Sequence, residues 1–260
     1  MLWQKYVWQR QTTAQLAGYY QRSQRWIRNQ LDKAPVTRSF LKPQPVVVVA
    51  DMTFEKQSFG VCVLRSPHLR KNLIWKTAQK ETVSIYHECR LRLQHQGFDV
   101  VAAVIDGKPG LIEVFWDVPV QMCQFHQIAI ITRYLTSRPR LEAGQALRAL
   151  ALTVAQSTEE DFQLQLRAWY IQWESFLREK TFNQETNRWF YTHKRLRSAY
   201  RSLKNNLGLL FTYQRFPELN IPNTTNSLDG TFSHLKDLLR IHRGLKLKRK
   251  LKLIEEFLSK

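Results

Sequence analysis

Two apolar segments that each run into an aspartate constrain the fold of this chain more than any other feature. The segment 45–54, PVVVVADMTF, is rich in valine and predicts a buried strand that ends in the carboxylate of Asp51. The segment 98–110, FDVVAAVIDGKPG, predicts another apolar strand, which stops at Asp106 and Gly107. At the end of a strand a side chain leaves the core and reaches a cleft, so Asp51 and Asp106 are the first candidate site residues.

The segments around these two strands predict an α/β fold. Strands at 57–65 and 72–77 form an antiparallel meander with the first strand, and a helix follows at 81–96. After the strand that ends at Asp106, a short fifth strand in VPVQM runs into a helix at about 124–135. Periodicity alone supports a mixed sheet in an α/β domain. The order of the elements is that of an RNase H-like core, in which the first and fourth strands lie side by side.

Residues 1–34 predict a small DNA-binding segment. Two helical stretches lie within 12–31, with Thr13 and Ser23 as their N-caps. Their shared core would be formed by Leu16, Ala17, Tyr20, Trp26, Ile27 and Leu31. The polar residues that face outward on the second helix, where they can reach base edges, would be Gln24, Arg25, Arg28 and Asn29. This is the layout of a helix-turn-helix, and an ordinary helical hairpin also fits these residues.

The other domain boundaries follow from changes in composition. Three prolines in 35–45 predict a linker, and 46–136 forms the first part of the core. A helical pattern predicts an all-helical insertion at 137–222. Aromatic residues at helical spacing in this insertion predict a helix core: Trp169, Trp173 and Phe176. Residues 223–260 would add the C-terminal helix of the catalytic core and a basic tail.

The formal net charge of +19 predicts a polyanionic partner, and double-stranded DNA is the first candidate. Aromatic residues can stack on bases, which favours nucleic acid over a generally basic surface. Cys62, Cys89 and Cys123 are widely spaced and odd in number, which indicates a reducing compartment rather than a disulfide framework. Because no long apolar run and no signal-peptide core are found, we expect a cytoplasmic, nucleoid-associated protein without a membrane partner.

The two aspartates suit a metal-dependent reaction. If the first and fourth strands are neighbours, Asp51 and Asp106 are close together, and like charges at that distance need a cation between them. Magnesium prefers oxygen ligands, and two ions about 4 Å apart can activate an attacking oxygen and stabilise a leaving one. Manganese would be expected to substitute. Taken singly, Asp106-Gly107 is also explained as a turn and Asp51 as a strand-end cap.

A third acid is expected on the last helix. The polar cluster 223–226 can cap this helix, whose buried face would consist of Leu228, Phe232, Leu235 and Leu239. Asp229 lies in the first turn, on a polar stripe with two candidate DNA contacts, Lys236 and Arg240. By itself Asp229 is explained by its interaction with the helix dipole. Two neighbouring acids compete with it for the role of third ligand: Glu218 and Asp237.

Three stretches resemble the IS256 and Mutator-like family of DDE transposases, in particular a branch whose members often begin with a zinc ribbon. The stretches are VVVVADMTF, VVAAVIDGKPGLIEVFWDVPVQMCQFHQ and NTTNSLDGTFSHLKDLLRIHRGL, and the likeness runs from about Leu2 over nearly the whole chain. The resemblance implies that Asp51, Asp106 and Asp229 bind two magnesium ions and cut DNA. Many members carry glutamate at the third position, where this chain has Asp229. A helical insertion between the second and third acids is also implied.

Two features of the chain bear on the resemblance. The family's Cys-x-x-His corresponds to Cys123 and His126, which supply only two of the four ligands of a structural zinc site. We interpret the pair as a local brace near the active site, with a DNA contact by His126 as the alternative. No Cys-x-x-Cys occurs in the sequence, so the zinc ribbon of the relatives is expected to be absent.

Together these observations predict a DNA transposase. It would bind the terminal inverted repeats of its mobile element, hydrolyse phosphodiester bonds and transfer the freed strand to target DNA. Since two element ends must be brought together, a homo-oligomer on DNA is expected. Two alternatives stay open: another RNase H-like nuclease, and a catalytically impaired DNA-binding remnant that represses its element.

Overall fold

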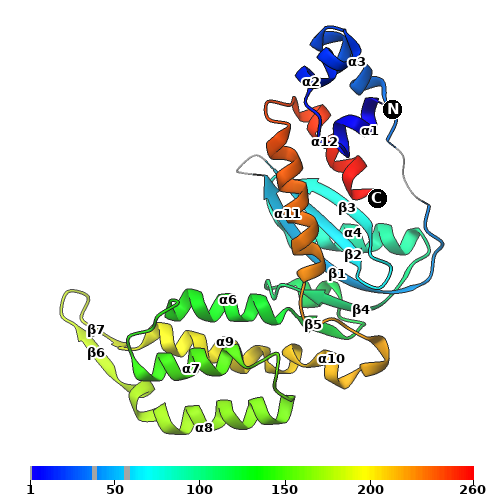
Figure 1. The fold of residues 1–260 in the computed structure, drawn as a ribbon. Helices are drawn as coiled ribbons and strands as arrows, with labels where there is room; N and C mark the ends of the chain where they lie inside the picture. Colours follow the sequence, from blue (N-terminus) through cyan, green and yellow to red (C-terminus); the bar gives the residue numbers. More distant parts are fainter. Residues whose placement is uncertain (1, 37–39, 56–58) are drawn as a thin grey trace. The chain divides into compact units, whose positions relative to one another are not determined.

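A computed structural model describes residues 2–36, 40–55 and 59–260, which leaves part of the predicted 35–45 linker outside the described residues. The chain forms two compact units (Figure 1). The first unit comprises 1–45, 51–99 and 226–260, and the second comprises 46–50 and 100–225. No helix within the described ranges has the length and apolar character needed to cross a membrane.

One five-stranded sheet has the order β3-β2-β1-β4-β5. Its strands are β1 (Pro45–Glu55), β2 (Phe59–Ser66), β3 (Lys71–Ala78), β4 (Asp99–Ile105) and β5 (Val120–Met122). Strands β2 and β3 pair antiparallel, whereas β4 and β5 pair parallel. The predicted α/β class with a mixed sheet is therefore confirmed, and so is the neighbourhood of the first and fourth strands. The RNase H-like assignment within this class stays a prediction.

Strand β1 is longer than the sequence predicted. It continues through Asp51 to Glu55, so the expectation that the strand ends at Asp51 is wrong. The residues that follow have β-branched and aromatic side chains, Thr53 and Phe54, which favour an extended backbone. Met52 and Thr53 are also buried, so the core continues beyond the aspartate.

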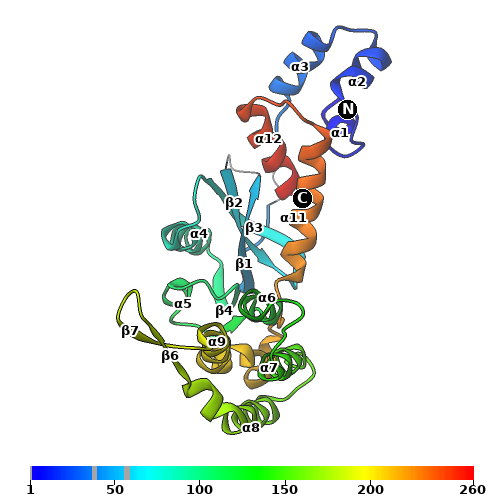
Figure 2. The same cartoon turned by 90° about the vertical axis from the view of Figure 1, so that its left-hand side faces the viewer.

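The first unit combines its antiparallel strands with several helices. These are α1 (Leu2–Val7), α2 (Thr13–Tyr20), α3 (Gln24–Lys33), α4 (Val83–His95), α11 (Asn226–Ile241) and α12 (Leu247–Leu258). Figure 2 shows α4 and α11 on opposite sides of strands β2 and β3. Helix α11 buries the predicted apolar face, Leu228, Phe232, Leu235 and Leu239, together with Leu238. The basic tail folds as α12 and buries Leu253, Ile254 and Leu258, a role that its charge did not indicate.

The second unit consists mainly of helices. They are α5 (Leu111–Val114), α6 (Gln124–Leu135), α7 (Glu142–Leu152), α8 (Glu159–Arg178), α9 (Lys194–Leu210), α10 (Thr212–Arg215) and the 3-10 turn η1 (Pro217–Leu219). Helix α6 has the predicted bounds. Trp169 is buried in the helical core, and Trp173 and Phe176 pack against it, so the helix-core interpretation of these rings is confirmed.

The expectation of an all-helical insertion is wrong, because a two-stranded antiparallel hairpin separates α8 from α9. Its strands are β6 (Lys180–Asn183) and β7 (Arg188–Tyr191). The strands contain Thr, Phe, Trp and Tyr, which favour extended backbone. Asn183 starts the turn by accepting the main-chain N–H of Thr186 at its Oδ1, 3.0 Å away, and Asn187 has a left-handed φ of 50°. Strands of four residues are too short to show a clear period in the sequence.

Candidate functional site

Asp106 directly follows β4 and is held on a rigid turn. Its Oδ1 accepts the main-chain N–H of Lys108 at 2.9 Å. Gly107 has a φ of 82°, and a side chain there would collide with Met122 of β5. Glycine is therefore favoured by the left-handed backbone conformation, and any larger side chain would also have to displace the flexible side chain of Met122. The half-buried Asp106 carboxylate is positioned by the sheet rather than by a mobile loop.

Asp51 is buried within β1, with 8% of its surface exposed. Its Oδ1 accepts the main-chain N–H of Met52 at 2.7 Å. The nearby thiols of Cys62 on β2 and Cys89 on α4 are buried and hydrogen-bonded to each other. That hydrogen bond, with burial and the negative charges of Cys89, Asp51 and Glu81, raises the pKa of Cys62. The three cysteines of the chain are free, and the predicted reducing compartment stays a prediction.

Asp229 lies in the first turn of α11, as predicted, and is half-buried beside Leu228 and Phe232. Its competitors differ in their surroundings. Glu218 is exposed in η1, and Asp237 forms an ion pair with Arg240 at 3.0 Å. The ion pair gives Asp237 a structural partner of its own.

The three aspartates belong to different parts of the fold. Asp51 and Asp229 lie in the first unit and Asp106 in the second, so the convergence of all three stays a prediction. Within the described ranges, no group of three or more His, Cys, Asp and Glu side chains is arranged to hold a metal ion. The adjacent positions of β1 and β4 in the sheet are the observation that links Asp51 to Asp106.

Cys123 and His126 form a local cluster with Thr225 in the second unit. The Thr225 N–H donates to Cys123 Sγ at 3.3 Å, and the Thr225 hydroxyl lies 3.5 Å from His126 Nδ1. Burial raises the pKa of the Cys123 thiol, but hydrogen bonds with His126 and Thr225 outweigh it and leave the pKa below its ordinary value. These contacts tie the start of α6 to the segment before α11, as expected of a brace. Asn223 and Thr225, which belong to the polar cluster predicted to cap α11, both contact this junction, and the capping itself stays a prediction.

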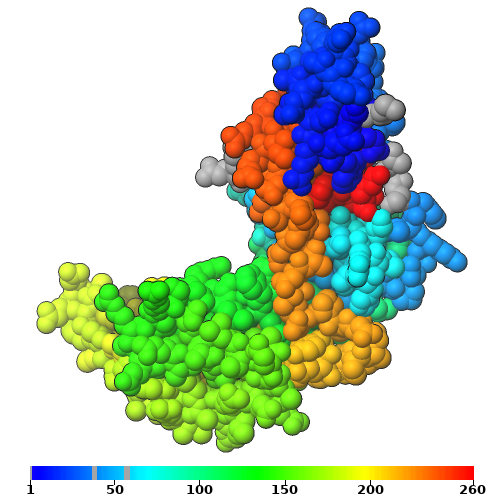
Figure 3. Space-filling view, in the orientation of Figure 1, coloured from blue at the N-terminus to red at the C-terminus, as the bar shows by residue number. Residues whose placement is uncertain are grey.

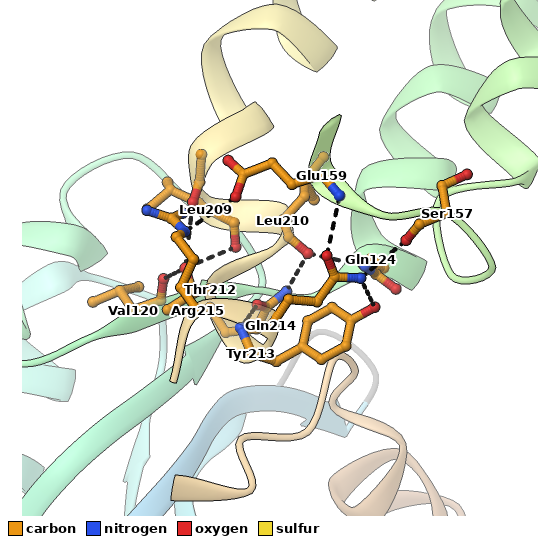
Figure 4. Close-up of polar contacts among 12 residues, drawn as sticks. Val120, Gln124, Ser157, Glu159, Leu209, Leu210, Thr212, Tyr213, Gln214 and Arg215 are labelled. Carbon is orange, nitrogen blue, oxygen red and sulfur yellow. Dashed lines mark hydrogen bonds and ion pairs between the residues drawn. The ribbon is translucent and has the colours of Figure 1, made fainter. Parts of the chain in front are cut away.

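Two buried glutamines of the same motif anchor the helices that follow. Gln121 and Gln124 each donate from Nε2 to the main-chain carbonyl of Leu210 at 2.9 Å, at the end of α9. The Tyr213 N–H donates to Gln121 Oε1 at 3.0 Å. Figure 4 labels Gln124, Leu210 and Tyr213 among these contacts. The sequence does not reveal this role directly, although polar residues inside an apolar strand–helix junction are a usable signal of buried hydrogen bonds.

A second set of contacts extends this anchor to α8. The Thr212 hydroxyl donates to the carbonyl of Val120 at 2.7 Å, and Gln214 Nε2 donates to the carbonyl of Ser157 at 3.0 Å (Figure 4). The side-chain oxygen of Gln214 accepts the N–H of Glu159 at 3.0 Å, at the start of α8. The insertion is thus joined to β5 through the end of α9 and the start of α10, and α10 is joined in turn to the start of α8.

The N-terminal helices have the predicted order, with two corrections. Thr12 rather than Thr13 caps α2, in a capping box with Gln15, while Ser23 caps α3 as predicted. Trp26 is 39% exposed and does not belong to the core formed by Leu16, Ile27 and Leu31, while Ala17 and Tyr20 are half-buried. The burial of Ile27 and Leu31, four residues apart, fixes the inward face of α3 and turns Trp26 away from it.

The polar residues proposed to contact DNA lie on the exposed face of α3. Gln24, Arg25, Arg28 and Asn29 are all exposed, as predicted, and so are Lys236 and Arg240 on α11. Exposure makes a DNA contact feasible for each of them, and the contact itself stays a prediction.

Helix α12 holds α3 in place with charged groups. Arg249 forms a two-pronged ion pair with Asp32, with N–O distances of 2.8 and 2.6 Å. The Arg249 hydrogen bonds hold the pKa of Asp32 below its ordinary value. Lys252 Nζ donates to the carbonyls of Leu31 at 2.7 Å and Asp32 at 2.9 Å, where a cation stabilises the C-terminus of a helix. The basic residues of α12 therefore include structural contacts to α3.

Comparison with models of known protein families and with curated proteins gives no match for this chain. The resemblance to transposases carried by the three motifs therefore stays a prediction.

Proposed function

We propose that this chain is the catalytic part of a DNA transposase that cuts and joins phosphodiester bonds. One observation carries the proposal: β1 and β4 are neighbours in a mixed sheet, and Asp51 lies within β1 while Asp106 directly follows β4. Two acids on adjacent strands, together with a first-turn acid on a later helix, form the residue set expected for metal-dependent phosphoryl transfer.

The donor chemistry of these acids fits magnesium. Carboxylate oxygens are the ligands that magnesium prefers, and one or two carboxylates suffice beside the phosphates of a substrate. Main-chain N–H groups donate to the Oδ1 atoms of Asp51 and Asp106 and so orient both carboxylates. Metal binding would therefore cost little additional side-chain entropy at these two residues. Asp229 would supply the third carboxylate. When bound, magnesium would polarise the phosphate and activate the attacking oxygen.

The reaction follows from this ligand set. Attack of a water oxygen on phosphorus breaks the bond to the strand's 3′ oxygen and leaves a free 3′-hydroxyl. Attack of that hydroxyl on a phosphate of target DNA then joins the two strands and breaks the bond from that phosphorus to the target strand's 3′ oxygen, which leaves as a 3′-hydroxyl. Both steps are in-line displacements at phosphorus, so one site serves both, and no covalent bond between protein and DNA is required.

Charge and exposed side chains support DNA as the partner. The net charge of +19 favours a polyanion, and the outward face of α3 presents Arg25 and Arg28 beside Gln24 and Asn29. We expect duplex recognition of element ends by this face, a homo-oligomer that holds two ends, and association with the nucleoid.

The test is cleavage of labelled duplexes taken from the DNA that flanks the gene, with magnesium or manganese. Wild-type protein should nick the strand at the element end. Asp106→Asn keeps the shape of the side chain but removes its charge, and should lower the rate by about 10³-fold. Asp99→Asn, at the exposed opposite end of β4, is the matched control and should cut like wild type. Equal rates for wild type and Asp106→Asn would refute the assignment.

The exposed face of α3 also favours a second candidate, a DNA-binding remnant that represses its element. It predicts tight binding of the terminal repeats by wild type without cleavage under either metal. Another nuclease on the same fold would cut without preference for element ends, so the substrate series separates all three functions.

A further inference from the structure

The hairpin β6–β7 carries two large aromatic side chains that stay partly exposed, Phe182 and Trp189. Phe182 and Trp189 are directly paired across the two strands, with ring centroids 5.1 Å apart. Phe182 is 40% exposed and Trp189 is 66% exposed. Figures 1 and 3 show the hairpin projecting beyond the ends of the neighbouring helices of its unit. An isolated two-stranded hairpin has no core of its own, so exposed large rings on it call for a partner.

Cations lie on the same face as these rings. Side chains alternate along a strand, so Lys180 and Tyr191, which are paired with each other, share the face of Phe182 and Trp189. The Arg197 guanidinium lies 3.6 Å from the Tyr191 ring centroid, and Lys180 Nζ lies 5.4 Å from it. We call the face formed by Lys180, Phe182, Trp189 and Tyr191 the hairpin face.

A hollow lined by residues of α8 and α9, which we call the α9 hollow, lies next to the hairpin face. Arg197 lines the hollow and also contacts Tyr191 of the hairpin face. The hollow has a volume of about 490 Å³, and its lining includes Arg197, Arg201 and Lys204. The hollow also contains the stacked rings of Tyr170 and Tyr200, whose centroids are 4.9 Å apart. Arg201 and Lys204 are exposed and form no ion pair with any described residue. The hollow is therefore suited to an anion next to a flat ring.

The segment from Lys180 to Lys204 is strongly basic, and the two acids next to it, Glu174 and Glu179, are paired with Arg178 and His193. From Lys180 to Lys204 the chain has seven lysines and arginines against a single acid, Glu185. A purely apolar partner, or a second copy of this basic surface, would leave these cations uncompensated. A strand of nucleic acid matches both features, because its phosphates pair with the cations and its bases stack on the rings.

We propose that the hairpin face and the α9 hollow bind DNA whose bases are unpaired, with bases stacked on Trp189 and Phe182 and phosphates on Arg197, Arg201 and Lys204. Paired bases present only their edges, so rings of this size are reached by bases that have left the duplex. The inference rests on the proposed function for DNA as the substrate but not on cleavage. It assigns to the insertion a role different from the duplex recognition proposed for α3.

The test compares binding of the full-length protein to one labelled 20-nucleotide strand, both alone and as a duplex, by fluorescence anisotropy at fixed salt. The double variant Phe182→Ser/Trp189→Ser should bind the single strand at least 10-fold more weakly, an estimate on the order of one stacked base, and bind the duplex as wild type does. Trp116→Ser is the matched control, because Trp116 is 80% exposed elsewhere in the same unit. It should change neither affinity.

The remaining outcomes separate the explanations. Wild-type affinity of the double variant for the single strand, or an equal loss on both DNA forms, overturns the inference and leaves the proposed function standing. Failure of wild-type protein to bind either DNA form overturns both. Sedimentation of the same proteins provides a further check, because a dimer that the double variant abolishes would identify the hairpin face as a contact between copies. Every variant must have the circular dichroism spectrum and melting temperature of the wild type. In the same binding assay, Arg201→Ala/Lys204→Ala should reduce the salt dependence of single-strand binding.

Discussion

The N-terminal helices and the hairpin–α9 region are similar in composition but present their side chains in opposite ways. Residues 1–34 have six lysines and arginines against one acid, close to the seven against one from Lys180 to Lys204. In the first region the helices bury Leu16, Ile27 and Leu31, and the exposed face of α3 presents long polar side chains beside a single ring, Trp26, while Tyr19 of α2 is also exposed. In the second region the hairpin exposes Phe182 and Trp189 themselves.

The difference comes from the geometry of the elements. A helix can turn its apolar side chains to one face and bury them, and α12 supports α3 from behind with Arg249 and Lys252. A two-stranded hairpin has two faces and no second layer, so its rings stay in solvent. Although the two regions are similar in composition, the first presents polar side chains that can contact base edges, and the second presents rings on which bases can stack.

The largest expected effect comes from removing one of the three candidate metal ligands. These acids lie outside both the exposed face of α3 and the hairpin face. Asp229→Ala should lower strand cleavage by about 10³-fold while duplex binding is retained, because only a metal ligand is lost. Glu218→Ala and Asp237→Ala should still cut, and Asp229→Glu should retain activity if the longer side chain reaches the metal. Cleavage assays and binding titrations on the same preparations check this. A fully active Asp229→Ala beside an inactive Glu218→Ala would move the third ligand to η1.

The next effect tests whether the recognition face depends on its buried side. Ile27→Ala removes a fully buried side chain from α3 and should cost about 2–5 kcal/mol of stability. Hydrogen exchange of the α2 and α3 amides should become faster, and duplex affinity should fall. Leu203→Ala, an equally buried position of α9, is the control and should leave exchange in α2 and α3 unchanged. Equal acceleration in both variants would mean that the two regions do not unfold separately.

A smaller effect distinguishes base reading from phosphate contact on α3. Arg25→Ala or Arg28→Ala should weaken binding to the element end by about 1–3 kcal/mol if the arginine reads a base. If it contacts only phosphate, all sequences should lose affinity alike. The control Arg167→Ala removes the same charge from an exposed position of α8. Titrations at fixed salt that show no loss for either α3 variant would refute the helix-turn-helix role.

The smallest effect is a pH dependence confined to the first unit. His242 is buried beside Tyr6 of α1, and its Nε2 donates to the Tyr6 carbonyl at 3.0 Å. Burial lowers the pKa of His242, although this main-chain hydrogen bond opposes the shift. The folded state thus favours the neutral ring. Its stabilising effect is complete above the unfolded pKa of about 6.5 and is lost as pH falls from there through the lower folded pKa.

Thermal melting between pH 7 and pH 5 checks this dependence. Wild type should lose more stability over the interval than His242→Gln, which has no proton to gain. His95→Gln replaces an exposed histidine of the same unit and should follow wild type. Parallel melting curves for wild type and His242→Gln would show that the ring does not report on the contact between α1 and the end of α11.

Prediction from the sequence succeeded where a local pattern was long enough to repeat. The continuous apolar runs identified β1 and β4 as buried strands, and the spacing of apolar residues identified the helix 124–135. Burial leaves such a pattern in the sequence whenever an element is long enough. Prediction failed at the hairpin β6–β7, whose strands have four residues each, and at Trp26, where an aromatic side chain was assumed to be buried.

The candidate site shows the same division. The sequence by itself located Asp106 directly after β4 and Asp229 in the first turn of α11, although it ended β1 too early, at Asp51. Tertiary structure alone decided that Cys123 and His126 meet Thr225, about a hundred residues away, and that Gln121 meets Leu210. The physical reason is that polar pairing between distant segments depends on where the chain folds back, and no local period encodes that return. Hydrophobic periodicity is local, whereas the partner of a buried polar atom is chosen by the whole fold.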